Sequence, residues 1–238
     1  MSITVASWNI DQGFSQRAQV FNYLTHVEHL DADVIVLPEA YGQRILAYMT
    51  TVERICSIIG YQLVYADYAK QHAEPGGLMV LSRLDNSLVP SEGRHQGMIS
   101  GTIVDPDTQV PVHLSAVDLT ANRAAVIRTH TAVLAKTVRH QPAAIVAGDF
   151  EPGVQEFYDQ TLAKTRRFSR AGRRLAPQAV ASRLSQAGYQ NVDPVQSSRR
   201  QAQILAAGPN CRPAQFTLVE ARGATINRAI RATFETGF

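Results

Sequence analysis

Three polar residues of this 238-residue chain stand within two positions of the end of a short apolar run: Asn9, Glu39 and Asp149. Carboxylate and amide oxygens are hard ligands of the kind that Mg²⁺ takes, usually as one or two carboxylates together with a substrate phosphate. Taken singly, each carboxylate is as typical of a helix cap or an ion pair as of a ligand. Taken together, the three residues suggest metal-assisted chemistry at a phosphate group.

The apolar runs that precede these residues predict buried strands at 3–8, 34–37 and 143–147. In α/β proteins the functional side chains gather where strands end, at one edge of a sheet. We therefore expect the three polar side chains to lie close together at such an edge.

Strands and helices alternate along the rest of the chain. Further strands are predicted at 61–65, 78–81, 98–104, 110–119, 216–219 and 225–230. Helices are predicted at 43–59, 124–138, 154–162 and 177–187, and after Ser15, where the expected apolar face is Val20, Phe21, Leu24, Val27 and Leu30. This alternation indicates an α/β fold with helices layered on buried sheets. We find no internal repeat or linker, so a single domain over residues 1–238 is expected.

The composition excludes several classes of protein. Hydrophobic residues make up 45% of the chain and charged residues 18%, which is typical of a globular protein and not of a disordered or fibrous one. No apolar run approaches the ~20 residues of a membrane span. Residues 1–3 lead into the first strand without a basic leader segment, and Cys56 and Cys211 form no disulfide or metal pattern. We therefore expect a cytoplasmic protein.

Charge is distributed unevenly between the two halves of the sequence. Residues 1–110 hold 6 basic and 12 acidic residues, whereas residues 111–238 hold 17 and 8. An arginine-rich run in the second half also contains Phe168, which could stack on a base. Its arginines are candidates for contact with phosphate or nucleic acid: Arg166, Arg167, Arg170, Arg173 and Arg174. The alternative is a solvated loop with no ligand.

Four segments, in this order, resemble motifs of the endonuclease/exonuclease/phosphatase superfamily, which has the deoxyribonuclease-I-like fold. Residues 7–10 resemble its N-terminal strand with the active-site Asn, and residues 33–39 resemble its D-hydrophobic-LQE segment. Residues 76–83 resemble its GxAILSR strand, and residues 144–150 resemble its GDFN strand. The resemblance implies an α/β four-layer sandwich, in which two packed mixed β-sheets are flanked by helices.

The resemblance also implies an activity, that of a divalent-metal-dependent phosphoester hydrolase with Mg²⁺ or Mn²⁺ as cofactor. Glu39 and Asp149 would hold the metal ion, and Asn9 and Asp149 would position water and phosphate. The implied partner is a phosphate-ester substrate, with nucleic acid as one class among several.

Three candidate catalytic residues depart from the family pattern. Asp118 stands where the family has a His that contacts the scissile phosphate, Glu151 where GDFN has Asn, and Asn227 where an Ile-Asp-Tyr motif has Asp. Asp118 and Glu151, together with Glu39 and Asp149, give four site carboxylates. This is the number that the family pattern has, at partly different positions. One divalent ion would leave such a pocket net negative, and arginine would be needed to hold a phosphate.

The family's closing Ser-Asp-His motif, and the strand after it, have no counterpart before Phe238. In the family that strand pairs beside the N-terminal strand, so we expect an unpaired sheet edge there. The alternative hypothesis follows from this departure: an impaired or truncated family member that acts as a phosphate- or nucleic-acid-binding module.

Overall fold

The computed structural model describes residues 2–10, 13–15, 17–40, 49–67, 77–91, 97–119, 124–138, 140–150, 183–192, 202–219 and 228–236. The predicted helix at 154–162 and the arginine-rich run lie outside these residues. So does most of the predicted helix at 177–187, of which only the last turn is described.

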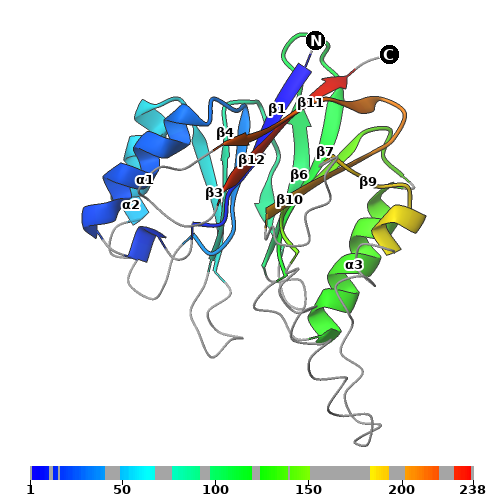
Figure 1. Cartoon of the computed structure of the whole chain (residues 1–238), viewed down its shortest axis with the longest axis horizontal. Coiled ribbons are helices and arrows are strands. Elements are labelled where there is room, and N and C mark those ends of the chain that lie inside the picture. The colour runs from blue at the N-terminus through cyan, green and yellow to red at the C-terminus, as the bar shows by residue number, and fades with distance from the viewer. Residues whose placement is uncertain are drawn as a thin grey trace, which may run out of the picture.

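Two six-stranded sheets pack face to face (Figure 1). The first sheet has the order β11 (Cys211–Val219), β12 (Ala229–Thr236), β1 (Ser2–Ser7), β2 (Val34–Leu37), β4 (Gly77–Ser82) and β3 (Gln62–Asp67). The second has the order β5 (Val89–Pro90), β6 (Met98–Val104), β7 (Pro111–Asp118), β8 (Ala144–Asp149), β10 (Ala202–Ala207) and β9 (Gln190–Asn191). Both sheets are mixed, because β1 pairs with β2 and β7 with β8 in parallel, whereas the other pairs are antiparallel.

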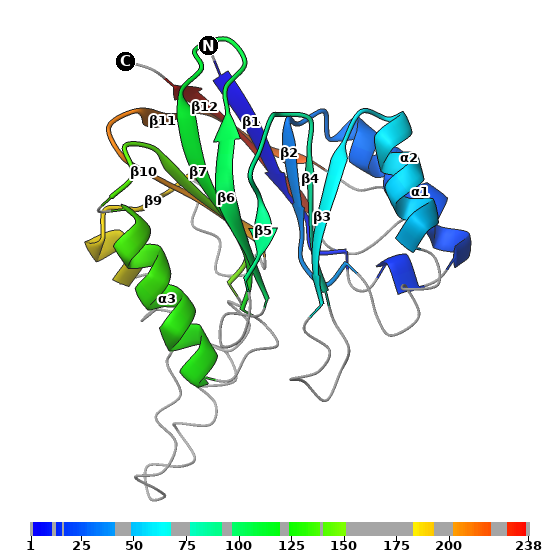
Figure 2. The same cartoon turned by 180° about the vertical axis from the view of Figure 1, so that it is seen from behind.

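Helices cover the outer faces of the two sheets. The helices η1 (Gly13–Ser15), α1 (Arg17–His29) and α2 (Met49–Ile58) lie outside the first sheet, and α3 (Ala124–Val138) lies outside the second (Figure 2). This arrangement confirms the predicted four-layer sandwich. None of the described helices is long and apolar enough to cross a membrane.

The main hydrophobic core fills the space between the two sheets. Because successive side chains of a strand point to opposite faces, Ile3 and Val5 of β1 enter this core, whereas Ala6 points to the helices. The same alternation sends Ile230, Ala232 and Phe234 of β12 into the space between the sheets. Burial of each large aliphatic or aromatic side chain contributes about 1.5–3 kcal/mol, so this core is a main source of stability.

The apolar face of α1 differs from the predicted one at a single residue. Val20, Leu24, Val27 and Leu30 are buried, as predicted, whereas Phe21 is 61% exposed. Phe21 lies about 100° around the helix from Val20, at the side of the buried stripe. Tyr23 takes its place in the core at 4% exposed.

The strand β1 is paired on both sides, which corrects the expectation of an open edge beside it. It pairs with β2 in parallel and with β12 in antiparallel register, from Ser2 opposite Glu235 to Ser7 opposite Ile230. The sequence pattern had placed the last strand at 225–230, but β12 begins at Ala229 and continues to Thr236.

Candidate functional site

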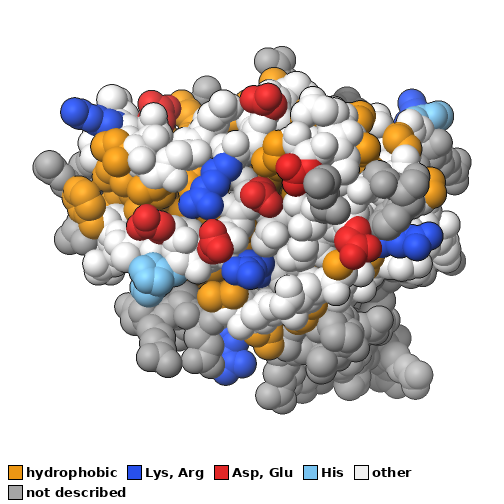
Figure 3. Space-filling model, turned by 90° about the horizontal axis from the view of Figure 1, so that it is seen from above, with side chains coloured by type: hydrophobic (Ala, Val, Ile, Leu, Met, Phe, Trp, Pro, Cys, Tyr) orange, Lys and Arg blue, Asp and Glu red, His pale blue; other side chains and the backbone are white. Residues whose placement is uncertain are grey.

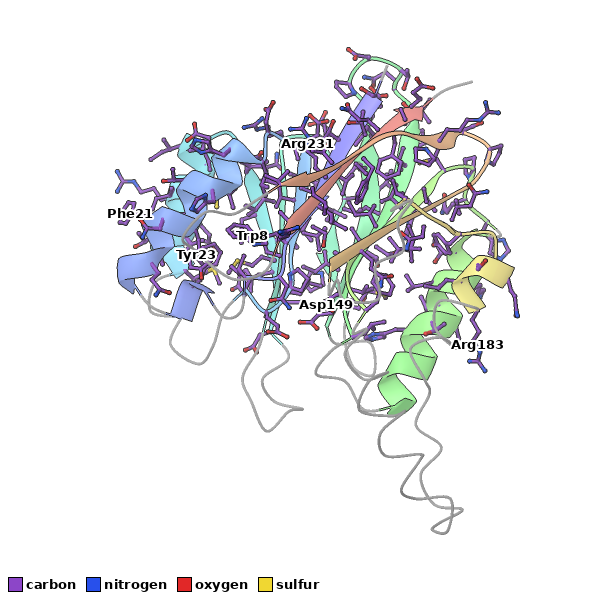
Figure 4. The ribbon with its side chains drawn as sticks, in the orientation of Figure 1. Trp8, Phe21, Tyr23, Asp149, Arg183 and Arg231 are labelled. Atoms are coloured by element: carbon purple, nitrogen blue, oxygen red, sulfur yellow. The ribbon has the colours of Figure 1, made fainter. Side chains whose placement is uncertain are left out.

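The ends of four strands, two from each sheet, bring together four of the predicted site residues. Asn9 follows β1 and Glu39 follows β2 in the first sheet, while Asp118 and Asp149 end β7 and β8 in the second. Asp118 and Asp149 lie side by side in the parallel register of these two strands. Figure 4 shows Asp149 at the lower edge of the sandwich, the edge that faces away from the two termini.

Asn9 and Asp149 form a hydrogen bond that crosses from one sheet to the other. The Nδ2 of Asn9 donates to Oδ2 of Asp149 at 2.7 Å. The two residues are 1% and 0% exposed, so the bond lies in a low-dielectric environment. A bond to a carboxylate at this distance is charge-assisted and stronger than one between neutral groups. It fixes the orientation of both side chains.

Trp8 explains why Asn9 points toward the other sheet. The Trp8 side chain is fully buried and packs against Tyr23 at 5.6 Å and His26 at 6.0 Å between ring centroids, both on α1. Adjacent residues in extended backbone point to opposite faces. Anchoring Trp8 under the helix therefore directs Asn9 into the space between the sheets.

Gly148 allows Asp149 to end β8 close to β7. Its φ is +145°, a value that residues with a side chain rarely adopt. A Cβ atom at this position would lie 1.8 Å from the carbonyl oxygen of Val117. The glycine before Asp149 is thus required by the close approach of the two strands that carry the site.

Glu39 sits in a turn with strained backbone. Its φ is +50°, in the left-handed region that is uncommon for residues other than glycine. Its backbone N–H donates to Oδ2 of Asp118 at 3.3 Å, a second hydrogen bond between the two sheets. The next residue is also held, because Ala40 N–H donates to the Gly77 carbonyl at 2.8 Å and the Ala40 carbonyl accepts from Phe14 N–H at 3.1 Å.

The donor set at this edge fits a hard divalent cation. Across the described part of the chain, no three His, Cys, Asp or Glu side chains gather closely enough to hold a metal ion by themselves. Mg²⁺ does not require such a cage, because it usually keeps several waters and takes one or two carboxylates plus substrate phosphate. Glu39 and Asp149 are the residues that could supply these two carboxylates.

Seven of the predicted site residues lie outside the described residues. They are Glu151, Asn227, Arg166, Arg167, Arg170, Arg173 and Arg174. Their assignments stay predictions from the sequence.

Arg228 is a site candidate that sequence reasoning missed. The ladder between β1 and β12 ends at the Ser7–Ile230 pair, and Asn9 and Arg228 each lie two residues beyond that pair, at the same end of the ladder. Arg228 is exposed there. In the sequence, Arg228 follows Asn227 in the segment compared with the family's Ile-Asp-Tyr motif. The pairing of β12 with β1, which shows where this segment lies, is not visible from local sequence.

The fold resembles that of several solved structures. No protein-family model matches the sequence, and no curated protein is similar to it in sequence. The structure resembles an endonuclease/exonuclease/phosphatase from Beutenbergia cavernae with a TM-score of 0.65 and 13% identity, covering 99% of this chain and 72% of that chain. It also resembles the 3′ phosphatase NExo from Neisseria bound to product DNA hairpin, with a TM-score of 0.65, 12% identity, and coverage of 99% and 100%.

A third similar structure is the human Nocturnin catalytic domain with bound sulfate anion, at a TM-score of 0.62 and 15% identity, with 99% of this chain and 95% of that chain covered. The chain has the endonuclease/exonuclease/phosphatase fold. The fold expected from the four sequence motifs is thereby confirmed. At these identities the likeness concerns the arrangement of the backbone, and the activity has to be argued from this chain's own residues.

Proposed function

We propose that this chain is a divalent-metal-dependent phosphoester hydrolase. The observation that carries the proposal is the buried Asn9–Asp149 hydrogen bond, which joins the two sheets beside Glu39 at one edge of the endonuclease/exonuclease/phosphatase fold. Two structures of similar fold support it: one is described as a 3′ phosphatase bound to product DNA hairpin, and the other has a bound sulfate anion.

Each residue of this edge has a role in the proposal. Glu39 and Asp149 hold Mg²⁺ or Mn²⁺, which when bound supplies Lewis-acid polarisation of a phosphoryl oxygen. Asn9 keeps the Asp149 carboxylate in one orientation, and the Asn9–Asp149 pair positions the attacking water and the phosphate. Because both side chains are fixed before the substrate arrives, little reorganisation remains for the reaction itself.

The carboxylates at this edge create a need for cationic groups. Glu39, Asp118 and Asp149 together exceed the charge of one divalent ion, and a phosphate ester adds further negative charge. We propose that Arg228, at the same end of the β1–β12 ladder as Asn9, offsets part of this charge. The arginines of the run 166–174 are proposed to contact the phosphates of a nucleic acid substrate.

We place this activity in the cytoplasm. Both cysteines, Cys56 and Cys211, are unpaired and buried, which suits a reducing compartment. Burial raises the pKa of each thiol to about 12, so neither thiol is a nucleophile at neutral pH.

A second candidate function, phosphate binding without hydrolysis, is favoured by one observation. Asp118 places a fully buried carboxylate where the resemblance implies a phosphate-contacting histidine. An anion at that position repels a phosphate instead of donating a hydrogen bond to it. The two functions differ in whether the site turns over a substrate.

Hydrolysis of bis(p-nitrophenyl) phosphate in the presence and absence of Mn²⁺ distinguishes them. We expect turnover that requires the metal, and a loss of about 10²–10⁴-fold in Asp149→Asn. The matched control is Asp107→Asn, which makes the same chemical change at an exposed residue of the β6–β7 turn and should keep the wild-type rate. Retained affinity for inorganic phosphate with no turnover by the wild type would support the binding function instead.

A further inference from the structure

Asp118 differs from the other acidic residues of the site in what its carboxylate contacts. Its Oδ2 accepts a hydrogen bond from the backbone N–H of Glu39 at 3.3 Å, across the space between the two sheets. The residue is 0% exposed, so this hydrogen bond lies in the interior between the two sheets.

The backbone of Asp118 is fixed on both sides of its strand. The Asp118 N–H donates to the Gly97 carbonyl at 3.1 Å, and the next N–H, of Leu119, donates to the Asp149 carbonyl at 2.9 Å. The ladder between β7 and β8 continues to the Asp118–Asp149 pair. The carboxylate therefore projects from a rigid support.

The Glu39 turn requires such a support because of its conformation. A left-handed glutamate carries steric strain, and it persists only where its surroundings hold it. The first sheet holds the turn at Ala40, through its hydrogen bonds with Gly77 and Phe14. Asp118 holds it at Glu39 itself, from the opposite sheet.

We propose that Asp118 is a positioning residue, which fixes the Glu39 turn through its N–H and thereby sets where the Glu39 carboxylate projects. In this role Asp118 acts through Glu39. Its effect on metal binding and activity rests on the function proposed above, whereas its effect on the Glu39 turn does not.

Amide hydrogen exchange of Glu39, measured by NMR on the full ¹⁵N-labelled chain without metal, tests this role directly. In the wild type we expect the Glu39 amide to be protected. In Asp118→Ala, which lacks the acceptor, exchange should be faster by about tenfold to a hundredfold, the range of a lost hydrogen bond to a charged group. In Asp118→Asn, whose side-chain oxygen can still accept, protection should stay close to that of the wild type.

Ser115→Ala is the matched control, because Ser115 is a buried polar residue of β7 between two core residues and points away from the site. It should leave the Glu39 amide unchanged. If Asp118→Ala does not fold, the wild type alone decides: a Glu39 amide that exchanges at the rate of an unstructured peptide overturns the proposal. Equal protection in the wild type and Asp118→Ala overturns it as well.

Calorimetric titration with Mn²⁺ then separates two effects of Asp118 on metal affinity, its positioning of Glu39 and its negative charge. Loss of a group that orients a metal ligand typically weakens metal affinity by about 10–100-fold. We expect a loss of this size in Asp118→Ala and a much smaller one in Asp118→Asn. Equal losses in both variants would assign Asp118 a purely electrostatic role and contradict the proposal. An exchange result as predicted, combined with no metal binding by the wild type, would leave the positioning role standing and refute the proposed hydrolase.

Discussion

Glu39 combines a ligand-type side chain with a backbone conformation that glutamate rarely adopts. Its φ of +50° is one of three positive values at described residues other than glycine, and it occurs where strand β2 ends at the candidate site. Strain of this kind persists when function requires a particular side chain at a position that glycine would occupy more readily. The sequence motif identified Glu39 as a ligand, but a motif contains no information on φ.

Glu39→Gly should therefore make the protein more stable while removing the metal ligand. We expect a gain of about 1 kcal/mol in the free energy of unfolding, from relief of left-handed strain partly offset by the entropy of glycine in the unfolded chain. Urea denaturation measures it, with Glu39→Ala as control, since alanine keeps the strain. A Glu39→Gly protein no more stable than Glu39→Ala would contradict this explanation.

At the scale of elements, the end of β12 is joined to the β6–β7 turn by a buried carboxylate. Asp105, 0% exposed, accepts hydrogen bonds from the Thr236 hydroxyl, from Asp107 N–H at 2.9 Å and from Thr108 N–H at 3.4 Å. Burial by itself raises the pKa of Asp105, but these hydrogen bonds outweigh it and hold the pKa below its usual value of 3.8. The second sheet thus holds the last described strand of the first.

This lowered pKa makes the contribution of Asp105 dependent on pH. It is fully present above the unfolded pKa of about 3.9 and is lost as the pH falls through the lower folded pKa. At pH 7 we expect Asp105→Asn to be less stable than the wild type by about 1–3 kcal/mol. Urea denaturation between pH 7 and pH 2.5 should show this difference shrinking below about pH 4. A difference that is constant over this range would mean that the carboxylate charge has no part in it.

The strands differ in how well local sequence predicts them. The runs predicted at 34–37 and 143–147 are apolar on both faces and buried throughout, and they correspond to β2 and to the first part of β8, Ala144–Asp149. Strand β11 was predicted only at 216–219, because the residues 212–215 are exposed and a register shift between Pro213 and Gln215 interrupts the two-residue period. Strand β10 was missed altogether. The first and last residues of β12 are set by its pairing with the distant strand β1, so the local sequence pattern does not predict them.

At the scale of the whole molecule, hydrogen bonds join the two sheets at both ends of the sandwich. Asn9–Asp149 and Glu39–Asp118 join them at the site edge, and Thr236–Asp105 joins them at the end near the termini. On the face seen from above, the described acidic and basic side chains are interspersed, without a field of one sign (Figure 3). In the proposed function a polyanionic partner approaches the opposite edge, where Asp149 lies.

Binding of a single-stranded DNA oligonucleotide tests whether the arginine-rich run serves that approach. Affinity should fall with salt concentration, and the slope of log affinity against log salt should decrease by about 0.7 for each arginine that contacts a phosphate. We expect a smaller slope when Arg166, Arg167, Arg170, Arg173 and Arg174 are replaced by Gln. The matched control replaces five exposed basic residues elsewhere by Gln: Arg54, Arg83, Lys136, Arg183 and Arg212. Equal slopes in the two variants would mean that the arginines of the run face solvent and do not contact the phosphates of the oligonucleotide.

The sequence predicts site residues that follow apolar runs, but it does not predict contacts that depend on how distant strands pair. Asn9, Glu39 and Asp149 were found because each stands within two positions of the end of an apolar run. The contact of Asp118 with the Glu39 backbone depends on how the two sheets meet, and the position of Arg228 at the Asn9 end of the ladder depends on the pairing of β12 with β1. Neither is encoded in the spacing of residues along the chain.

The most direct test of the central claim, that the two sheets jointly form one hydrolytic site, is a double-mutant cycle on Mn²⁺-dependent phosphodiester hydrolysis. It compares Asn9→Ala, Asp149→Ala and the double variant with the wild type. Residues that act as a unit are strongly non-additive, so each single variant should lose about 10²–10⁴-fold and the double variant little more. Losses that multiply in the double variant, or turnover that survives Asp149→Ala, would contradict the account.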